Sequence, residues 1–173
     1  VSNIVGGPFY NSGLTSVTFE TGTDKVVGNL FHYAEKLENV ALLDTMTTIG
    51  DSAFYGCKSL REIRLPNKLT AIEEEAFKDC TALKSIDIPD TVTRIGFSAF
   101  SGCTNLSDVS LSKNLESIGC RAFASCSSLI EIEIPKSLRS ASVSYYNGVS
   151  NIVGGPFYNS GLTSVTFETG TDK

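Results

Sequence analysis

IGDSAFYGCKSLREIRL, residues 49–65, is the stretch that decides the fold, because its pattern recurs three more times at a constant offset of 23 residues. The copies occupy residues 72–88, 95–111 and 118–134, and each keeps an aliphatic residue, an Ala-Phe pair, a Cys, a Leu and two more aliphatic residues in the same positions. A fixed period of this length is typical of a solenoid, in which each repeat forms one coil and buries its apolar side against its neighbours. We therefore expect a long, regular surface rather than an enzyme built around one deep pocket.

Weaker copies extend the pattern in both directions, so we expect a single domain over residues 1–173 with about seven coils. The second coil has Ala34 in the position of the Cys, and the first coil is one residue short between Phe9 and Leu14. The last coil follows an insertion at residues 139–151. These weaker copies place apolar residues in the repeat positions at Ile4, Phe9, Leu14, Val17, Phe19, Val26, Phe31, Leu37, Val40, Leu42, Ile152, Phe157, Leu162, Val165 and Phe167.

The two ends of the chain carry the same sequence. Residues 1–25 and 149–173 are identical, at an offset of 148 residues that equals the combined length of six coil steps. The chain therefore holds one six-coil block and the start of a second. A natural array with duplicated blocks and a deliberate engineering of matching ends both explain this identity.

Composition excludes several classes of partner. The net charge is −5, the pI is near 4.9, and no cluster of Lys and Arg occurs, so phosphate backbones should repel the chain and we expect no nucleic-acid partner. No apolar run approaches 18 residues, so we expect no membrane insertion. The first residues also lack a basic region followed by an apolar run, so we expect no signal peptide in this stretch.

Within one coil, the spacing of apolar residues predicts two kinds of local structure. Spacings of four and three between Ala53, Cys57 and Leu60 predict a short helical turn with one buried side. The alternation of Ile63 and Leu65 predicts a short strand, which a proline ends in three of the four strong copies. We therefore expect an α/β-type repeat solenoid, with a parallel β-sheet on one face and short helical turns or irregular segments on the other.

The repeat also supports a named resemblance. IEEEAFKDCTALKSIDIPDTVTRIG, residues 72–96, closely resembles the repeat of the BspA-like leucine-rich repeat family. The resemblance is strong over four coils and weaker over the rest. It implies a right-handed solenoid from a bacterial cell-surface or secreted protein, or from some protozoan parasites. Members studied as adhesins bind host proteins such as extracellular-matrix components. The family brings no catalytic residues, so the resemblance implies a chain that is not an enzyme and needs no cofactor.

The cysteines are the first candidates for chemistry. Four of them recur at the repeat spacing, which lacks the close pairs typical of zinc sites, so buried free thiols are favoured over a metal site or disulfides. The fifth, Cys120, lies at a variable position, and we expect it to be the exposed thiol. The four periodic residues are Cys57, Cys80, Cys103 and Cys126.

Three other features have ordinary structural explanations. His32, the only histidine, lacks a neighbouring nucleophile and acid, so a surface or edge position is expected. The acidic residues 73–75 could bind a metal, but they are expected to start a helical turn, where its dipole favours carboxylates. The Gly-Gly-Pro sequences at 6–8 and 154–156 lack the lysine of a phosphate-binding loop and are expected to form coil corners. We expect no catalytic, metal-binding or cofactor-binding residues.

The outward positions of the predicted strands form the main candidate binding site. The repeat pattern leaves these positions free, yet stacking brings them together on one face, with mixed charge in the middle and small hydroxyl residues at both ends. This face could bind a ligand, or it could be a solvated surface with cross-strand charge pairs such as Arg64 with Asp87. The candidate ligand-binding residues on it are Arg61, Glu62, Arg64, Lys84, Asp87, Asp108, Glu131 and Glu133.

The insertion is the second candidate site. Its Asn-Gly pair at 147–148 lies between alternating residues, which predicts a hairpin turn. Tyr145 and Tyr146 precede this turn and would be interface anchors if they are exposed. They could equally cover the coil edge where regular stacking is interrupted.

Two functions remain open at this point. The first is a non-catalytic module of a cell-surface or secreted adhesin that binds a protein or glycan ligand, for example a host extracellular-matrix protein. The second is a structural spacer in a long surface repeat protein, because spacers tolerate exact block duplication. In either case we expect end-to-end self-association, because the coil ends lack polar caps.

Overall fold

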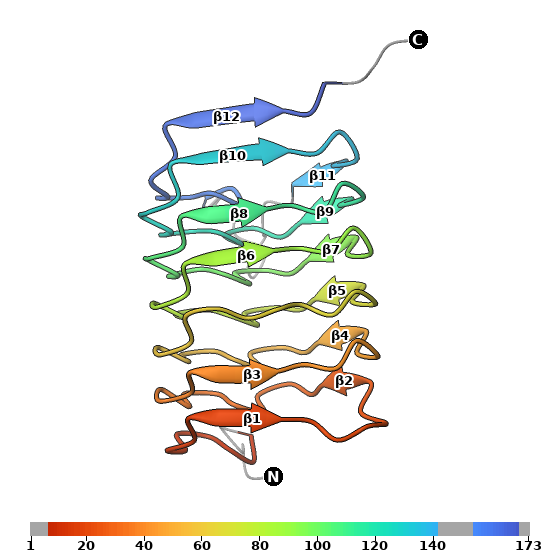
Figure 1. Ribbon diagram of the computed structural model, residues 1–173. Helices are drawn as coiled ribbons and strands as arrows, with labels where there is room; N and C mark the ends of the chain where they lie inside the picture. The colour runs from red at the N-terminus through yellow and green to blue at the C-terminus, as the bar shows by residue number, and fades with distance from the viewer. Residues whose placement is uncertain (1–6, 142–153, 170–173) are drawn as a thin grey trace, which may run out of the picture.

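Two stacks of short parallel strands run along the molecule, and turns and extended segments join them within each coil (Figure 1). The computed structural model describes residues 7–141 and 154–169. The first stack, which we call the front sheet, contains β1 (Ser16–Thr18), β3 (Asn39–Ala41), β6 (Ser85–Asp87), β8 (Asp108–Ser110), β10 (Glu131–Ile134) and β12 (Ser164–Phe167). The second stack, the side sheet, contains β2 (Lys25–Val26), β4 (Thr48–Ile49), β5 (Ala71–Ile72), β7 (Arg94–Ile95), β9 (Ser117–Ile118) and β11 (Ser140–Ala141).

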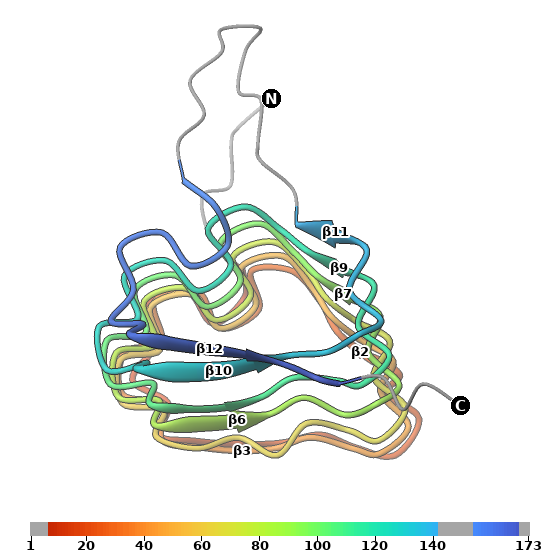
Figure 2. The same ribbon diagram turned by 90° about the horizontal axis from the view of Figure 1, so that it is seen from above.

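The side sheet is continuous, with six parallel strands in the order β11-β9-β7-β5-β4-β2. Ile49 pairs with Ile72, and Ile95 pairs with Ile118, so every coil supplies the same residue of its repeat. Seen down the stack, successive coils superimpose (Figure 2). The solenoid predicted from the period is therefore confirmed. The side sheet itself was not predicted, because each of its strands has only two residues and cannot show an alternating pattern.

The front sheet is less regular than the sequence suggests. It consists of three separate parallel pairs, β1 with β3, β6 with β8, and β10 with β12. Residues 61–65 occupy the position between β3 and β6 but form no strand. The ladder is therefore interrupted beside these residues, and again between β8 and β10.

The predicted helical turn is wrong, because the described residues contain no helix. Two residues with a positive φ angle flank each buried Phe and stop helical propagation; around Phe54 they are Ser52 (φ 53°) and Gly56 (φ 71°). The N–H of Phe54 donates to the carbonyl of Ala76 in the next coil at 2.8 Å. The backbone therefore bonds between coils, and the spacing of three and four marks a tight coil corner.

A column of stacked phenylalanines forms the centre of the core. Neighbouring rings lie 5.1–5.6 Å apart between centroids, at interplanar angles of 5–17°. The repeat Leu and Ile residues and the four periodic cysteines pack around this column and are almost all fully buried. The column consists of Phe9, Phe31, Phe54, Phe77, Phe100, Phe123 and Phe157.

The predicted division of residues 1–173 into about seven coils stays a prediction for the complete chain. Residues 1–6, 142–153 and 170–173 are outside the described part. Most of the insertion at 139–151 belongs to this group, including Tyr145 and Tyr146. In the Gly-Gly-Pro sequence at 154–156, Gly154 has a φ of 81° and Pro156 begins a turn.

Candidate functional site

The outward side chains of the front sheet are exposed on one continuous face, which we call the front face. All eight candidate residues predicted for it are exposed: Arg61, Glu62, Arg64, Lys84, Asp87, Asp108, Glu131 and Glu133. Each follows or precedes an inward residue of the same coil, for example Ile63 beside Arg64, because side chains alternate across a strand. The fold thus brings these residues to one surface, and their binding of a ligand stays a prediction.

The front face has an ordered distribution of charge. Its basic side chains lie in the central coils, at Arg61, Arg64 and Lys84. One carboxylate, that of Glu62, lies between Arg61 and Arg64, and the others extend from Asp87 through β8 to β10. Uncharged hydroxyl residues occupy β1 and the start of β12. A ligand that covers several coils would meet a region with an excess of basic side chains and then an acidic one.

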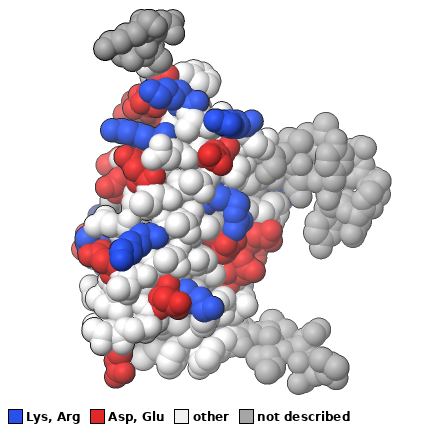
Figure 3. All heavy atoms as spheres, turned by 90° about the vertical axis from the view of Figure 1, so that its right-hand side faces the viewer, with Lys and Arg blue, Asp and Glu red and all other residues white. Residues whose placement is uncertain are grey.

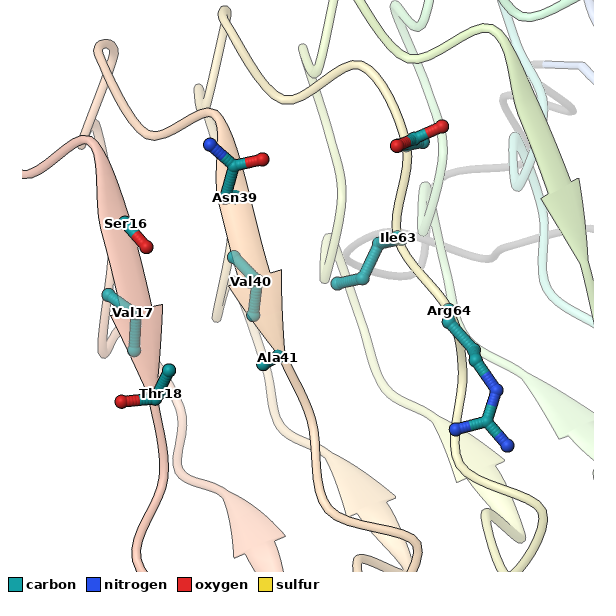
Figure 4. Close-up of a pocket in the computed structure, with 9 residues that line it drawn as sticks. Ser16, Val17, Thr18, Asn39, Val40, Ala41, Ile63 and Arg64 are labelled. Atoms are coloured by element: carbon teal, nitrogen blue, oxygen red, sulfur yellow. The ribbon is translucent and has the colours of Figure 1, made fainter.

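A hollow of about 420 Å³ opens where the front sheet is interrupted beside β3. Figure 4 shows a wider separation between β3 and the segment that carries Ile63 and Arg64 than between β1 and β3. Among the described residues, no backbone hydrogen bond joins residues 62–64 to β3. The backbone N–H and C=O groups that face the hollow are therefore open to water or a ligand. The hollow is lined by Ser16, Val17, Thr18, Asn39, Val40, Ala41, Glu62, Ile63 and Arg64.

Arg64 forms an ion pair at the edge of this hollow. Its Nη2 atom lies 3.3 Å from Oδ1 of Asp44, which belongs to the preceding coil. The predicted pair of Arg64 with Asp87 is therefore not the one that forms. The two paired side chains are 70% and 58% exposed, so the pair contributes at most about 1 kcal/mol and leaves the guanidinium accessible.

A second hollow of about 520 Å³ lies between β8 and β10, at the other interruption of the front sheet. Three carboxylates, from Asp108, Glu131 and Glu133, contribute to its walls. Within the described ranges, no cluster of His, Cys, Asp and Glu has the arrangement of a metal site. The remaining lining residues are Ser107, Val109, Ile132 and Thr166.

Sequence reasoning missed a cluster of aromatic side chains at the coil edge. The ring of His32 stacks on both Tyr33 and Tyr55, at 4.7 Å in each case. Tyr10 meets His32 edge-on at 5.6 Å, and Nζ of Lys78 lies 5.0 Å from the centre of the Tyr55 ring. The sequence does contain a signal for this cluster. The residue that follows each phenylalanine of the column is aromatic in the first three coils, at Tyr10, His32 and Tyr55, and is Lys78 in the fourth.

His32 is half-buried within this cluster. Its Nε2 atom is inaccessible to solvent and has no hydrogen-bond partner in the described part of the chain. Burial lowers its pKa, and the nearby carboxylate of Glu75 opposes this shift. The imidazole therefore favours its neutral form.

The four periodic cysteines are buried free thiols, as predicted. Each donates to a carbonyl oxygen 26 residues earlier, at 3.1–3.3 Å. Burial raises the pKa of all four, to about 12 for Cys57 and Cys126. These thiols therefore stay protonated and unreactive at neutral pH.

The prediction that Cys120 is exposed is wrong. Its exposed fraction is only 3%, and its Sγ atom lies 2.8 Å from the carbonyl oxygen of Gly154. Gly154 begins the coil that follows the insertion, 34 residues later. The residues next to Cys120 in sequence could not predict that a coil 34 residues later buries its thiol.

The acidic residues 73–75 do not start a helical turn, contrary to the prediction. Glu75 has a φ of 53° and pairs with Lys78 at 2.7 Å. Glu73 pairs with Arg94 of the next coil. The negative charges of Glu73 and Glu75 are therefore neutralised by neighbouring cations.

The side of the molecule on the right of Figure 1 carries interspersed charges of both signs among uncharged atoms (Figure 3). A nucleic-acid interface would instead show a continuous basic surface. In residues 7–141 and 154–169 there is also no helix long and apolar enough to cross a membrane.

Comparisons with known proteins agree with this architecture. The family model of the BspA type leucine rich repeat region matches residues 24–153, in six copies. A search of curated proteins found no match.

Solved structures of bacterial repeat proteins share the fold. A leucine-rich repeat protein from Bacteroides ovatus is 34% identical, with a TM-score of 0.68 over 72% of this chain and 32% of that one. The leucine-rich repeat protein of T. pallidum is 26% identical, with a TM-score of 0.67 over 88% of this chain and 72% of that one. The pneumococcal vaccine antigen PcpA is 24% identical, with a TM-score of 0.65 over 91% of this chain and 44% of that one, and shows the likeness of fold alone. The chain thus spans about a third of the Bacteroides protein.

Proposed function

Because this chain belongs to the BspA-type leucine-rich repeat family, we propose that it is a non-catalytic binding module of a cell-surface or secreted protein, and that its front face binds a protein or glycan ligand. The family supports the surface location and the absence of catalysis, since leucine-rich repeat proteins are generally non-catalytic. A host extracellular-matrix protein is the ligand class that the family suggests for an adhesin.

The observation that carries this proposal is the interrupted front sheet beneath a row of exposed charges. A continuous sheet would use its backbone groups in ladder bonds. Here residues 62–64 and β3 leave theirs open in a hollow that Glu62 and Arg64 border. A ligand can therefore bond to the backbone in the hollow while its charged groups meet the side chains around it.

The charge order of the front face indicates the kind of ligand. Basic side chains at Arg61, Arg64 and Lys84 suit acidic groups such as carboxylates of a protein or of an acidic glycan. The carboxylates of β8 and β10 would oppose a uniformly acidic polymer that extends over the next coils. A folded protein with both charge signs, or a short acidic glycan, fits this distribution best.

A binding screen with matched charge variants tests the proposal. The 173-residue chain is first screened against extracellular-matrix proteins and glycans. Each hit is then measured with a front-face variant, Arg61→Glu, Arg64→Glu and Lys84→Glu. The control variant carries Lys68→Glu, Lys113→Glu and Lys136→Glu, which change the net charge equally at exposed positions outside the basic region. We expect only the front-face variant to lose binding, by about tenfold or more. Equal losses in both variants, or no hit in the screen, would contradict the proposal.

A structural spacer is the second candidate function. The identity of residues 1–25 and 149–173 favours it, because a spacer can change its number of blocks without losing a specific surface. The two functions predict different sequences for the parent protein. Many near-identical blocks that end in an anchoring segment would support the spacer, whereas divergence of front-face residues between blocks would support binding.

A further inference from the structure

Two hollows of the front face meet at the segment that interrupts its sheet. The hollow of about 420 Å³ beside β3 is described above, and another of about 370 Å³ lies next to it. Asn39 and Glu62 line both hollows, so the two form one continuous depression, which we call the front depression. The hollow of about 370 Å³ is lined by Glu38, Asn39, Arg61, Glu62, Lys84 and Ser85.

Two cations lie side by side in this depression. Arg61 and Lys84 hold the same repeat position in adjacent coils, and the backbone N–H of Lys84 donates to the carbonyl oxygen of Arg61 at 3.1 Å. Both side chains are exposed, and neither forms an ion pair within the part of the chain that the structure describes. Neighbouring cations repel each other, so an anionic group bound between them would relieve this repulsion and accept hydrogen bonds from both.

The carboxylates of the depression limit how much negative charge can bind. Glu38 holds the repeat position of Arg61 in the preceding coil, and Glu62 follows Arg61 in sequence. Both line the same hollow as the two cations. One acidic group can contact the guanidinium and the ammonium, whereas a second acidic group beside it would meet Glu38 or Glu62 and be repelled. The ligand should therefore carry a single acidic group rather than the repeated charges of a polyanion.

The remainder of the depression matches neutral hydroxyl groups. Ser16 and Asn39 present a hydroxyl and an amide beside it (Figure 4), and neither side chain makes a hydrogen bond to another described residue. The backbone of residues 62–64 offers further donors and acceptors. Between these polar groups lie the partly exposed side chains of Val17 and Val40. Sugar rings combine hydroxyl groups with apolar C–H surfaces, so they fit this mixture.

A protein ligand fits the depression less well. Protein interfaces are centred on aromatic and large apolar side chains that pack into the partner. Within the described ranges, the exposed large apolar residues lie elsewhere and none lines either hollow. The volumes of about 420 and 370 Å³ are instead in the range of small-molecule sites. The exposed apolar residues are Phe9, Tyr10, Val27, Ile130, Tyr158, Val165 and Phe167.

We propose that the front depression binds a short oligosaccharide with one sugar carboxylate, which lies between Arg61 and Lys84, while neutral sugar units cover β1 and β3. The planar guanidinium of Arg61 can bond both oxygens of a carboxylate, and the ammonium of Lys84 adds a third donor. This inference rests on the proposed function and selects the acidic glycan from the two ligand classes named there.

Titration with matched oligosaccharides tests the inference. The isotope-labelled 173-residue chain is followed by NMR while sialyllactose or glucuronosyl-lactose is added, each of which has one carboxylate on a neutral disaccharide. Their methyl esters lack the charge, and trigalacturonate has a carboxylate on every unit. One variant combines Arg61→Gln with Lys84→Gln, and another carries Asn39→Ala. The control variant combines Lys68→Gln with Lys136→Gln, which removes the same charge at exposed positions outside the depression.

We expect at least one of the two single-carboxylate sugars to bind and to shift the amide signals of Asn39, Glu62 and Ser85. It should bind about tenfold or more tightly than its methyl ester and than trigalacturonate, because charge-assisted hydrogen bonds are lost or opposed in these. The variant with Arg61→Gln and Lys84→Gln should lose binding by a similar factor. Asn39→Ala should weaken binding by a few-fold, and the control variant should bind like the unchanged chain.

Several results would overturn the inference. They are equal binding of the methyl ester, tighter binding of trigalacturonate, an equal loss in the control variant, and no binding of either single-carboxylate sugar. The matrix-protein screen separates these failures from failure of the proposed function. If no sugar binds but a protein hit is lost on changing Arg61, Arg64 and Lys84 to Glu, the front face is a protein-binding site and only the glycan inference is wrong.

Discussion

The thiol of Cys103 donates to the carbonyl oxygen of Phe77 at 3.1 Å, across 26 residues of sequence. The same bond recurs from Cys57, Cys80 and Cys126 to the Phe of the preceding coil. The thiol therefore fills a small buried space and gives the carbonyl a second donor, beside the backbone N–H that it already accepts, which for Phe77 is that of Cys80 at 3.2 Å. This double role explains a column of cysteines without any metal or redox chemistry.

Cys103→Ala should lower the free energy of unfolding by about 1–2 kcal/mol. The change removes a buried sulfur and one of the two donors to the Phe77 carbonyl, which keeps the N–H of Cys80. Urea denaturation of the chain and the variant measures the difference. Asn105→Ala, at an exposed position of the same coil, serves as the control and should change stability by less than about 0.5 kcal/mol.

Alkaline pH should destabilise the protein through its buried thiols. Their pKa is raised in the folded state, to about 12 for Cys57 and Cys126, above the ordinary value of 9.0. Above pH 9 the unfolded chain therefore loses thiol protons that the folded chain keeps, so the stabilising contribution present at lower pH declines as the pH rises from 9 towards the folded pKa. Urea midpoints at several pH values measure this slope. Replacement of Cys57 and Cys126 by Ala should flatten it, and an unchanged slope would refute the explanation.

The phenylalanine column should be most sensitive at its centre. Phe77→Ala removes a fully buried ring that stacks on two neighbours, at a cost of about 3–5 kcal/mol. Phe9 is 42% exposed and stacks on one column neighbour only. Phe9→Ala should therefore cost less than half as much. Thermal and urea unfolding of both variants test this order, and equal costs would contradict a core organised around the column.

Gly119 should tolerate no side chain, because the backbones of two coils meet there. A Cβ atom at this position would lie 2.5 Å from the backbone atoms C of Gly96 and N of Phe97. Gly119→Ala should therefore destabilise the fold by about 1–3 kcal/mol, since backbone must move. A Cβ atom on Gly13 would meet nothing within 4 Å, so Gly13→Ala is the matched control and should leave the urea midpoint nearly unchanged.

The period of the sequence predicted the solenoid, the buried thiols and the exposure of the front-face residues, because each depends on the stacking of equivalent positions. Conformation within a coil was harder to predict. Spacings of three and four suit a helix and also a corner with left-handed residues, and residues such as Ser52 and Glu75 give no strong signal of a positive φ.

Contacts that join non-equivalent positions were beyond the reach of the pattern. Gly154 covers Cys120 from a coil that follows the insertion. Arg64 pairs with Asp44 of the preceding coil rather than with Asp87. The interruption of the front sheet beside residues 61–65 also has no sequence signal, since these residues alternate like those of the neighbouring strands.

Carboxylate labelling of a ligand complex tests the central claim, binding through the front face, most directly. The chain is treated with a carbodiimide and an amine, with and without a saturating ligand from the screen, and labelled residues are identified by mass spectrometry. The account predicts protection of Glu62 and Asp87, which flank the basic side chains, and unchanged labelling of Glu20, Asp24 and Glu116, which lie off that region. Protection of Glu20, Asp24 or Glu116 with unchanged labelling of Glu62 and Asp87 would contradict it.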